Sequence, residues 1–468
     1  MAAGRARLTI LSESPAAPSG VPPTTLTLHQ KLLAVGLVLA VMLVAFEVTA
    51  VITALPTITD ELGGDSLYGV SLAAYTLATL VSLVAAGELA DRYGPTVPFT
   101  VNIVLFVVGL VVGATANSMV LIVIGRTLQG AGTGGFPPIA YVLVKRAFPD
   151  DRQAAMYAFL SAGWVLPSLF APAISGWITE SFGWRWLFWA IIPLAVAVGV
   201  LAVRPMRDYG PVESSGPAAP SRVPTAVAAA VGIGALVIGL QVEKVAVAIV
   251  TSLIGTVVMV VALRRLLPAG FGRARSGLPA LIAVRMSATA AFLGVDSFVP
   301  LAADRIHEVS PLKQGFVIIG AALTWTVGQW YRVRRPGRNP VSAIRIGFLV
   351  MLLGILLVTP VLSASWPLPV TFAAWAVGGL GMGLLFNPST IAAMSYATEG
   401  NEGLVSSQVN LADSVGFSLM GGIGGATVAI AERTSWPLRD ALGLNFALAA
   451  AMTLVGVAVC RNVRSAAA

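Results

Sequence analysis

Long apolar segments recur along the whole chain, and each is close to the length that a helix needs to cross a bilayer. A transmembrane helix takes about 20 mostly apolar residues. Fourteen such segments can be delimited, at 32–58, 68–89, 97–116, 119–144, 153–180, 184–203, 225–242, 245–263, 278–301, 312–331, 342–362, 367–392, 403–430 and 440–461. Hydrophobic residues make up 57% of the chain and charged residues 11%, which lies far outside the range of soluble domains. We therefore predict an all-α, multi-pass membrane protein.

The 29 lysines and arginines are spread unevenly over the loops between these segments. If the N-terminus lies inside the cell, most of them fall in cytoplasmic loops, which is the side where such residues collect. An even number of spans with both termini in the cytoplasm is therefore favoured. The net charge of +8 is explained by this topology, since a nucleic-acid-binding protein would gather its bases on one face or arm. We expect no nucleic-acid partner.

Several kinds of site are disfavoured by composition. Cys460 is the only cysteine, so a disulfide framework or a thiolate metal site is excluded. The two histidines, His29 and His307, lie outside the predicted spans, which argues against a buried histidine site and against an intramembrane enzyme. The chain has no Gly-rich phosphate-binding loop with a lysine. We expect no metal and no cofactor.

The predicted segments are organised as two bundles of six. We expect a cytoplasmic tail at 1–31, a first six-helix bundle at 32–204, a linker carrying an inserted two-helix hairpin at 205–277, a second six-helix bundle at 278–461, and a tail at 462–468. Two six-helix halves are typical of transporters that alternate access between the two sides of a membrane. The number of spans alone also fits other polytopic proteins.

The stretch "GELADRYG" between the second and third segments resembles the loop signature of the major facilitator superfamily. The matching residues are Gly87, Leu89, Asp91, Arg92 and Gly94. A loop this short needs glycine to turn, and its aspartate can accept hydrogen bonds from a helix N-terminus. The resemblance implies that Asp91 locks the cytoplasmic side against the start of span 11, near Gly403. The basic pair that usually follows the last glycine is replaced by Pro95 and Thr96.

Further stretches resemble the fourteen-span drug–proton antiporters of that superfamily. "RTLQGAGTG" (126–134) is similar to the span 4 motif, in which the arginine takes part in proton coupling, and "FGWRWLFWAIIP" (182–193) is similar to the outer start of span 6. "PSLFAPAISGW" (167–177) matches the span 5 motif of exporters only in part. In "VAFEVTAVITALP" (44–56) an acid, Thr49 and an Ala-Leu-Pro end keep the spacing of span 1. The resemblance implies the fold over 32–461 and leaves the substrate open.

Five ionisable residues stand in the interior of spans, away from their ends, where each costs roughly 2.5–3.5 kcal/mol to insert. They are Glu47, Arg126, Arg285, Asp296 and Asp413. A glutamate that alternates between an apolar wall and an arginine contact can take up and release a proton. Our hypothesis is that Glu47 is the main proton site, that Arg126 tunes it, and that Asp296 is a second proton site or meets a cationic substrate. The alternative is a static Glu47–Arg126 ion pair that only orients helices.

Other polar residues within the spans are candidates for a substrate cavity. They are Tyr75, Gln129, Arg285, Asn387, Gln408, Asn410 and Asp413. Asp413 departs from the residues usual in such antiporters, which marks either a substrate contact or a pairing with Arg285. Asn387 and Pro388 are expected to interrupt a helix beside the cavity.

The function that we expect is proton-driven export of amphiphilic or cationic small molecules by alternating access. An exporter or flippase of cell-envelope lipids on the same fold is the alternative, followed by a metabolite symporter and by a membrane sensor without transport. The expected partners are membrane lipids, protons and the substrate, with the proton gradient as energy source. We expect a monomer in the inner (plasma) membrane of a bacterium.

Overall fold

A computed structural model of the chain describes residues 25–63, 67–211, 220–239, 245–308, 311–333 and 340–463. Most of the predicted N-terminal tail, and the last five residues of the C-terminal tail, lie outside these ranges. The described residues form helices joined by short loops, with no strand among them. The all-α prediction is confirmed.

The described residues of the first half form eight helices. They are α1 (Leu28–Leu62), α2 (Tyr68–Tyr93), α3 (Thr96–Ala114), α4 (Met119–Thr133), α5 (Phe136–Ala147), α6 (Asp150–Ala162), α7 (Val165–Phe182) and α8 (Arg185–Met206). The predicted segment 119–144 is divided between α4 and α5. The break falls at Gly134 and Gly135, and α5 then begins with prolines in its first turn, where the missing N–H has no intrahelical acceptor.

The inserted hairpin and the second half complete the fold. The hairpin is α9 (Val223–Gly239) and α10 (Val245–Leu266), and the second half contains α11 (Leu278–Asp296), α12 (Val299–His307), α13 (Pro311–Val333), α14 (Pro340–Val358), α15 (Leu368–Met394), α16 (Glu402–Arg433) and α17 (Leu438–Val459). Within the described residues, nine helical stretches are long and apolar enough to cross a membrane. The protein is therefore a multi-pass membrane protein.

One local prediction is wrong. Asn387 and Pro388 were expected to interrupt their helix, but α15 runs unbroken from Leu368 to Met394 with Pro388 inside it. Membrane helices tolerate an internal proline when neighbouring helices and polar side chains compensate for the freed backbone group. Here α15 is packed between α13 and α14, which hold it straight.

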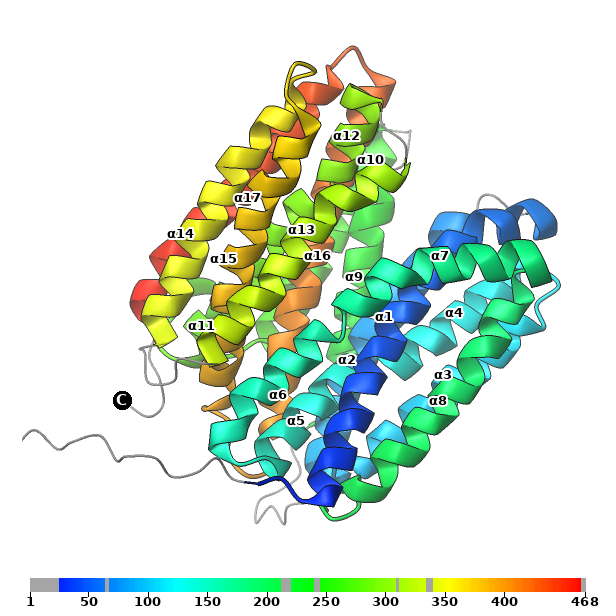
Figure 1. Ribbon diagram of the computed structural model, residues 1–468, viewed down its shortest axis with the longest axis vertical. Coiled ribbons are helices and arrows are strands. Elements are labelled where there is room, and N and C mark those ends of the chain that lie inside the picture. The colour runs from blue at the N-terminus through cyan, green and yellow to red at the C-terminus, as the bar shows by residue number, and fades with distance from the viewer. Residues whose placement is uncertain are drawn as a thin grey trace, which may run out of the picture.

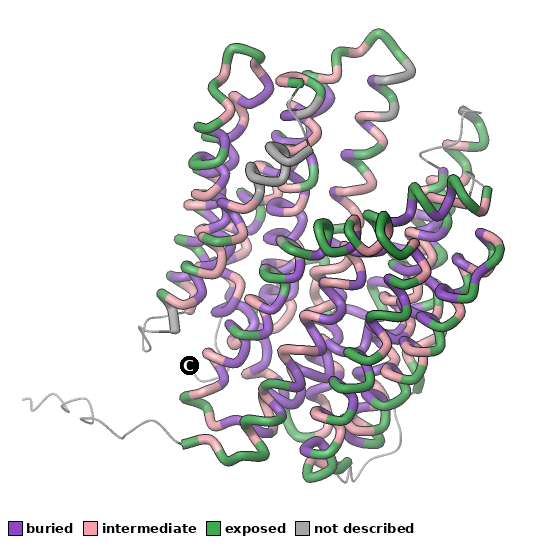
Figure 2. The backbone as a smooth tube through the Cα atoms, turned by 45° about the vertical axis from the view of Figure 1, so that its right-hand side comes forward, coloured by how far each residue is buried: buried purple, intermediate pink, exposed green. Residues whose placement is uncertain are grey.

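Two hydrophobic cores form, one in each half. The first is built from α1 to α8, and the second from α11 to α17 together with the hairpin. In Figure 1 the two halves lie close together near the start of α1 and diverge toward the ends of α7 and α12. Figure 2 shows buried backbone concentrated inside each half, while exposed positions follow the outer helices. The hairpin packs against α2 and also contributes to the second core, so it bridges the two halves.

Candidate functional site

A buried ion pair lies inside the first half. Arg126 of α4 donates a hydrogen bond from Nη1 to Oε1 of Glu47 on α1, and both side chains are almost fully buried, at 2% and 0% exposed. The ring of Tyr75 on α2 lies against Arg126, with the guanidinium carbon 4.1 Å from the ring centroid. We call Glu47 and Arg126 the buried pair. The structure thus joins two residues that are 79 positions apart in the chain.

Polar neighbours hold the arginine of the buried pair in place. Gln129, one turn along α4, accepts a hydrogen bond of 2.9 Å from Arg126 Nη1 and donates one of 3.1 Å to the carbonyl oxygen of Gly109 on α3. The hydroxyl of Tyr75 lies 2.9 Å from Oγ1 of Thr133. Arg126, Gln129 and Thr133 share one face because they are three and four residues apart. The polar face that these residues form is therefore assembled around Glu47.

The buried pair is incompletely satisfied within the described part of the chain. Oε2 of Glu47 and Nε of Arg126 have no hydrogen-bond partner there. An unsatisfied buried polar atom is costly, and more so when it is charged. One oxygen of Glu47 is therefore held by arginine, while the other has no partner among the described residues.

We expect Gln129→Leu to lower transport about tenfold without removing either charge, because losing a hydrogen bond to a charged group costs about 1.5 kcal/mol. The measurement is the initial rate of gradient-driven transport over a range of pH. Thr127→Val, on the exposed side of the same helix, is the control, since that hydroxyl donates to the Val123 carbonyl and does not touch the buried pair. A rate for Gln129→Leu equal to that of the wild type at every pH would contradict a positioning role.

A second charged pair lies inside the other half. Arg285 of α11 donates from Nε to Oδ1 of Asp413 on α16 at 3.1 Å, and Nη2 bonds Oδ2. Thr289 also donates to Oδ1, at 2.8 Å. The guanidinium of Arg285 lies over the ring of Phe386, 3.6 Å from its centroid, and Nη1 donates to the Phe386 carbonyl at 3.0 Å. The predicted pairing of Asp413 with Arg285 is confirmed.

The two members of this second pair differ in exposure. Arg285 is fully buried, whereas the side chain of Asp413 is 20% exposed. Asp413 is thus the more accessible member of the pair.

Asp296 lies apart from the buried pair. Its Oδ1 accepts a hydrogen bond of 2.7 Å from Nε1 of Trp375 on α15, and Trp375 stacks on Phe292. Both aromatic neighbours belong to the second half. Within the described residues Asp296 therefore makes no hydrogen bond or ion pair with Glu47 or Arg126, and its role as a second proton site or as a contact for a cationic substrate stays a prediction.

The remaining cavity candidates differ in exposure: Asn410 is partly exposed, whereas Asn387 and Gln408 are buried. Asn410 stays on the same face of α16 as Asp413, is partly exposed, and donates to the Ser406 carbonyl at 2.9 Å. Asn387 is buried and donates to the Ala154 carbonyl of α6 at 2.9 Å, so it joins the halves. Gln408 donates to the Leu266 carbonyl at the end of α10, at 3.0 Å, and is also buried. Gln408 was predicted to be a cavity residue. It lies two positions before Asn410, which places it on the opposite face of α16.

Gln408→Leu is expected to leave the order of preferred substrates unchanged and to lower stability by about 0.5–1.5 kcal/mol, the usual net value of one hydrogen bond. The thermal midpoint of the purified protein and a panel of transport rates provide the measurements. Asn410→Leu, on the face that carries Asp413, is the comparison and should alter the preferences. A changed preference in Gln408→Leu would return this residue to the cavity.

The contact expected between the "GELADRYG" loop and the neighbourhood of Gly403 is present. Oδ1 and Oδ2 of Asp91 accept hydrogen bonds from the backbone N–H groups of Gly403 and Leu404, at 2.6 and 2.8 Å. These N–H groups belong to the first turn of α16 and have no acceptor within the helix, so a carboxylate satisfies both their hydrogen bonds and the helix dipole. Gly87 packs directly on Gly403. Arg92 pairs with Glu88 one turn earlier, at 3.0 Å, and Gly94 ends α2 with a φ of 76°.

Other contacts between the halves were not predicted. Nη2 of Arg146 lies 2.8 Å from Oε2 of Glu402 in a buried ion pair. Ser406 donates to the Pro138 carbonyl at 2.8 Å, and Gln329 donates to Oγ of Ser161 at 2.6 Å. These contacts lie where the halves meet near the start of α1 (Figure 1). We call them, with the Asp91 contacts, the gate; the only signal in the sequence was polar residues close to the ends of predicted segments.

Known proteins resemble the chain throughout. The family model described as the Major Facilitator Superfamily matches residues 37–421. "Multidrug transporter protein MdtP" of Bacillus subtilis is 27% identical over 406 residues, which cover 82% of this chain and 73% of that protein. A "Probable multidrug-efflux transporter" of Mycobacterium tuberculosis strain H37Rv is 26% identical over 400 residues, with 81% and 84% covered.

Solved structures show the same fold at low identity. The human organic anion transporter MFSD10 superposes with a TM-score of 0.69 at 14% identity, covering 93% of this chain and 100% of that one. The proton:xylose symporter XylE superposes with a TM-score of 0.64 at 13% identity, covering 92% and 94%. A family model that matches most of the chain, together with this fold, settles the relationship. The chain belongs to the Major Facilitator Superfamily of transporters.

Proposed function

We propose that this protein is a proton-coupled exporter of amphiphilic or cationic small molecules. The observation that carries the proposal is the buried pair, in which Glu47 has one oxygen on Arg126 and the other without a partner among the described residues. A carboxyl group in this setting is stable when protonated and is also stable as an ion beside arginine, which is what a proton carrier requires. The names of the two bacterial relatives, both multidrug transporters, support a drug-like cargo.

Alternating access supplies the cycle. The gate joins the halves near the start of α1, which we propose is the cytoplasmic side, with both chain termini there and fourteen spans in the plasma membrane. Opening the gate requires the loss of the Asp91 and Arg146 contacts at the start of α16. We propose that the six-helix halves 32–204 and 278–461 move relative to each other as a monomer, with the hairpin region 205–277 between them.

The proton gradient is sufficient to drive this cycle without ATP or a cofactor. One proton moving down 100 mV releases about 2.3 kcal/mol. Because a tenfold concentration ratio costs about 1.4 kcal/mol, one proton per cycle sustains roughly a fifty-fold gradient of a neutral substrate. Protons, substrate and surrounding lipids are the partners in the proposal.

The test is transport by the purified protein in liposomes that contain a pH-sensitive dye. We expect lipophilic cations, added one at a time, to induce proton movement, and a protonophore to abolish gradient-driven accumulation. Liposomes without protein are the control. Movement induced by lipids and not by cations would favour the export of cell-envelope lipids. Substrate transport that is indifferent to the protonophore would overturn proton coupling.

Asp413→Asn is expected to reduce transport of cations about tenfold relative to neutral amphiphiles, because the exposed carboxylate loses an attraction worth about 1.4 kcal/mol. The ratio of the two transport rates is the measurement, and a ratio cancels any change in the amount of folded protein. Asp440→Asn is the matched control, since Asp440 is an exposed acid in the first turn of α17. An unchanged ratio in Asp413→Asn would remove this residue from the substrate site.

A further inference from the structure

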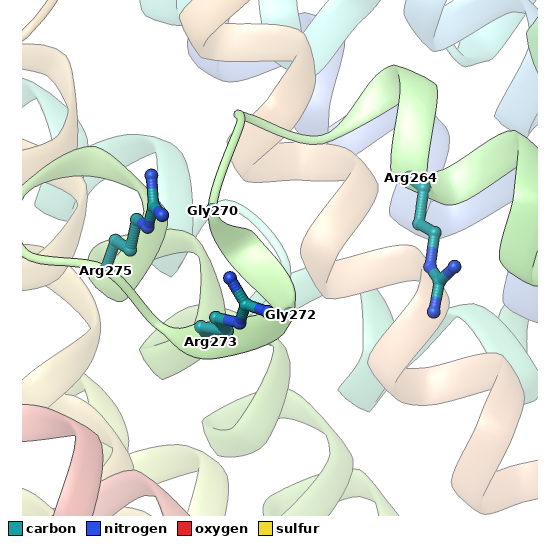
Figure 3. A pocket seen from close by; sticks show the side chains of 5 residues that line it. All are labelled: Arg264, Gly270, Gly272, Arg273 and Arg275. Carbon is teal, nitrogen blue, oxygen red and sulfur yellow. The ribbon is translucent and has the colours of Figure 1, made fainter.

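A concave basic surface lies where the inserted hairpin returns to the second half. The cavity has a volume of about 510 Å³ and is lined by Arg264, Gly270, Gly272, Arg273 and Arg275. Figure 3 shows Arg264 on the last turn of α10 and Arg273 and Arg275 on the loop that follows. We call Arg264, Arg273 and Arg275 the arginine pocket. All three side chains are exposed.

The arginine pocket has no neutralising group in the part of the chain that the structure describes. None of its three guanidinium groups makes an ion pair or a side-chain hydrogen bond there. Two arginines elsewhere show the contrast, since Arg146 is paired with Glu402 and Arg185 with Glu61. Exposed cations that line a hollow without a carboxylate favour an anionic ligand, and guanidinium groups bind phosphate oxygens in a forked geometry.

The loop that carries the pocket is held in shape by its own contacts. The N–H of Arg275 donates to the Gly270 carbonyl at 3.2 Å, and Asn462 near the chain end donates to the Ala274 carbonyl at 2.9 Å. Gly270 has a φ of 92°, and a Cβ atom there would meet the side chain of Arg275 at 2.6 Å. The two loop arginines are therefore displayed on a fixed backbone.

An exposed apolar face leads to the pocket. On α10 the large exposed side chains share one side of the helix, and Arg264 ends the same row. They are Val250, Leu253, Ile254, Val257 and Val261, between 47% and 62% exposed. Only 17% of the most apolar window of α10 is buried. From Leu253 to Arg264 the row spans roughly 16 Å at 1.5 Å per residue, which is room for an acyl chain beneath a headgroup.

We propose that this surface binds an anionic phospholipid, with its phosphate in the arginine pocket and its acyl chains along the exposed face of α10. The hollow selects phosphate, and the adjoining apolar row selects a lipid over a free anion. Because Gln408 of α16 bonds the Leu266 carbonyl beside the pocket, a bound lipid also steadies the connection between the hairpin and the helix that begins at the gate. The site goes beyond the proposed export and does not depend on proton coupling by Glu47.

Native mass spectrometry of the purified, delipidated full chain tests the proposal. Phosphatidylglycerol and phosphatidylcholine are offered together, and the bound lipids are counted. We expect wild type to retain phosphatidylglycerol in preference. The double variant Arg273→Gln/Arg275→Gln should bind phosphatidylglycerol only to the level of phosphatidylcholine. The control Arg204→Gln/Arg207→Gln, which removes two exposed arginines at the end of α8, should keep the wild-type preference.

Any other result would contradict the proposed phospholipid site. No preference in wild type, or a preference that survives in the pocket variant, would show that the arginine pocket holds no lipid. Equal loss in the Arg204 and Arg207 control would show attraction by overall charge. Inorganic phosphate in excess should leave phosphatidylglycerol bound, and its displacement by phosphate would show a site for a free anion. Equal gel-filtration profiles and equal phosphatidylcholine binding establish that the variants are folded.

Discussion

Replacing Glu47 with Gln is expected to reduce substrate-induced proton flux to the level of liposomes without protein, while exchange of substrate between the two sides continues. Glutamine cannot carry a proton, but it keeps the shape of the side chain and an oxygen for Arg126 Nη1. The protein then behaves as if permanently protonated, so it can move substrate in exchange and cannot complete a coupled cycle. The measurements are the pH-dye signal and radiolabelled substrate exchange on the same preparation.

Arg126→Ala supplies the complementary result. A buried carboxylate without its arginine is favoured in the neutral form, so Glu47 is expected to keep its proton and net coupled flux is again lost. Breaking a buried pair costs about 3–5 kcal/mol when a charge is left uncompensated. In Glu47→Gln the uncompensated charge is that of Arg126. Substrate exchange that continues in this variant therefore shows that it is folded. If Glu47→Gln keeps both exchange and proton flux, the buried pair is the static ion pair that orients helices.

Gly403→Ala is expected to open the gate and reduce transport strongly. A Cβ atom on Gly403 would meet Oδ1 of Asp91 at 2.9 Å and would lie still closer to the carbonyl of Gly87. Backbone cannot yield as a flexible side chain can, so the two helices must separate. Overpacking of this kind costs about 1–3 kcal/mol, which shifts the population away from the closed gate roughly 5- to 150-fold.

The distance across the gate reports this shift. Spin labels would be attached to cysteines that replace Tyr93 and Glu399, both of which are exposed. The native cysteine would be removed by Cys460→Ser. We expect a longer distance in Gly403→Ala than in wild type. Gly421→Ala on the same helix is the control, because nothing lies within 4 Å of a Cβ atom there. If Gly403→Ala shows the wild-type distance and rate, the contact of Gly87 with Gly403 does not hold the gate closed.

Much of the fold follows from local features of the sequence. Runs of about 20 apolar residues predict helices that cross a membrane, because backbone groups in hydrocarbon must be satisfied within the helix. Every helix in the described residues from α1 to α17 lies in or beside a predicted segment. The internal proline of α15 was misjudged because its effect depends on neighbouring helices, and no local pattern reports those.

Part of the candidate site could also be predicted from local features of the sequence. Charged residues in apolar segments, and the resemblance to a known loop signature, were enough to select Glu47, Arg126, Asp91 and the neighbourhood of Gly403. Each stands out because an ionisable or closely packed residue is unusual at its position. The contacts that the structure adds to these residues confirm their proximity, while their roles stay predictions.

Only the tertiary structure decided which polar residues act together. Arg146 and Glu402 are 256 positions apart, and nothing near either one indicates the other. Gln408 bonds the end of the hairpin, and Asp296 bonds Trp375. The rotation of each helix against its neighbours determines the partner of a side chain. The sequence by itself determined the helices, their place in a membrane and the ionisable residues whose insertion is too costly to occur by chance. Helix packing alone decided which of these residues meet, since periodicity defines a face of a helix and not what lies opposite it.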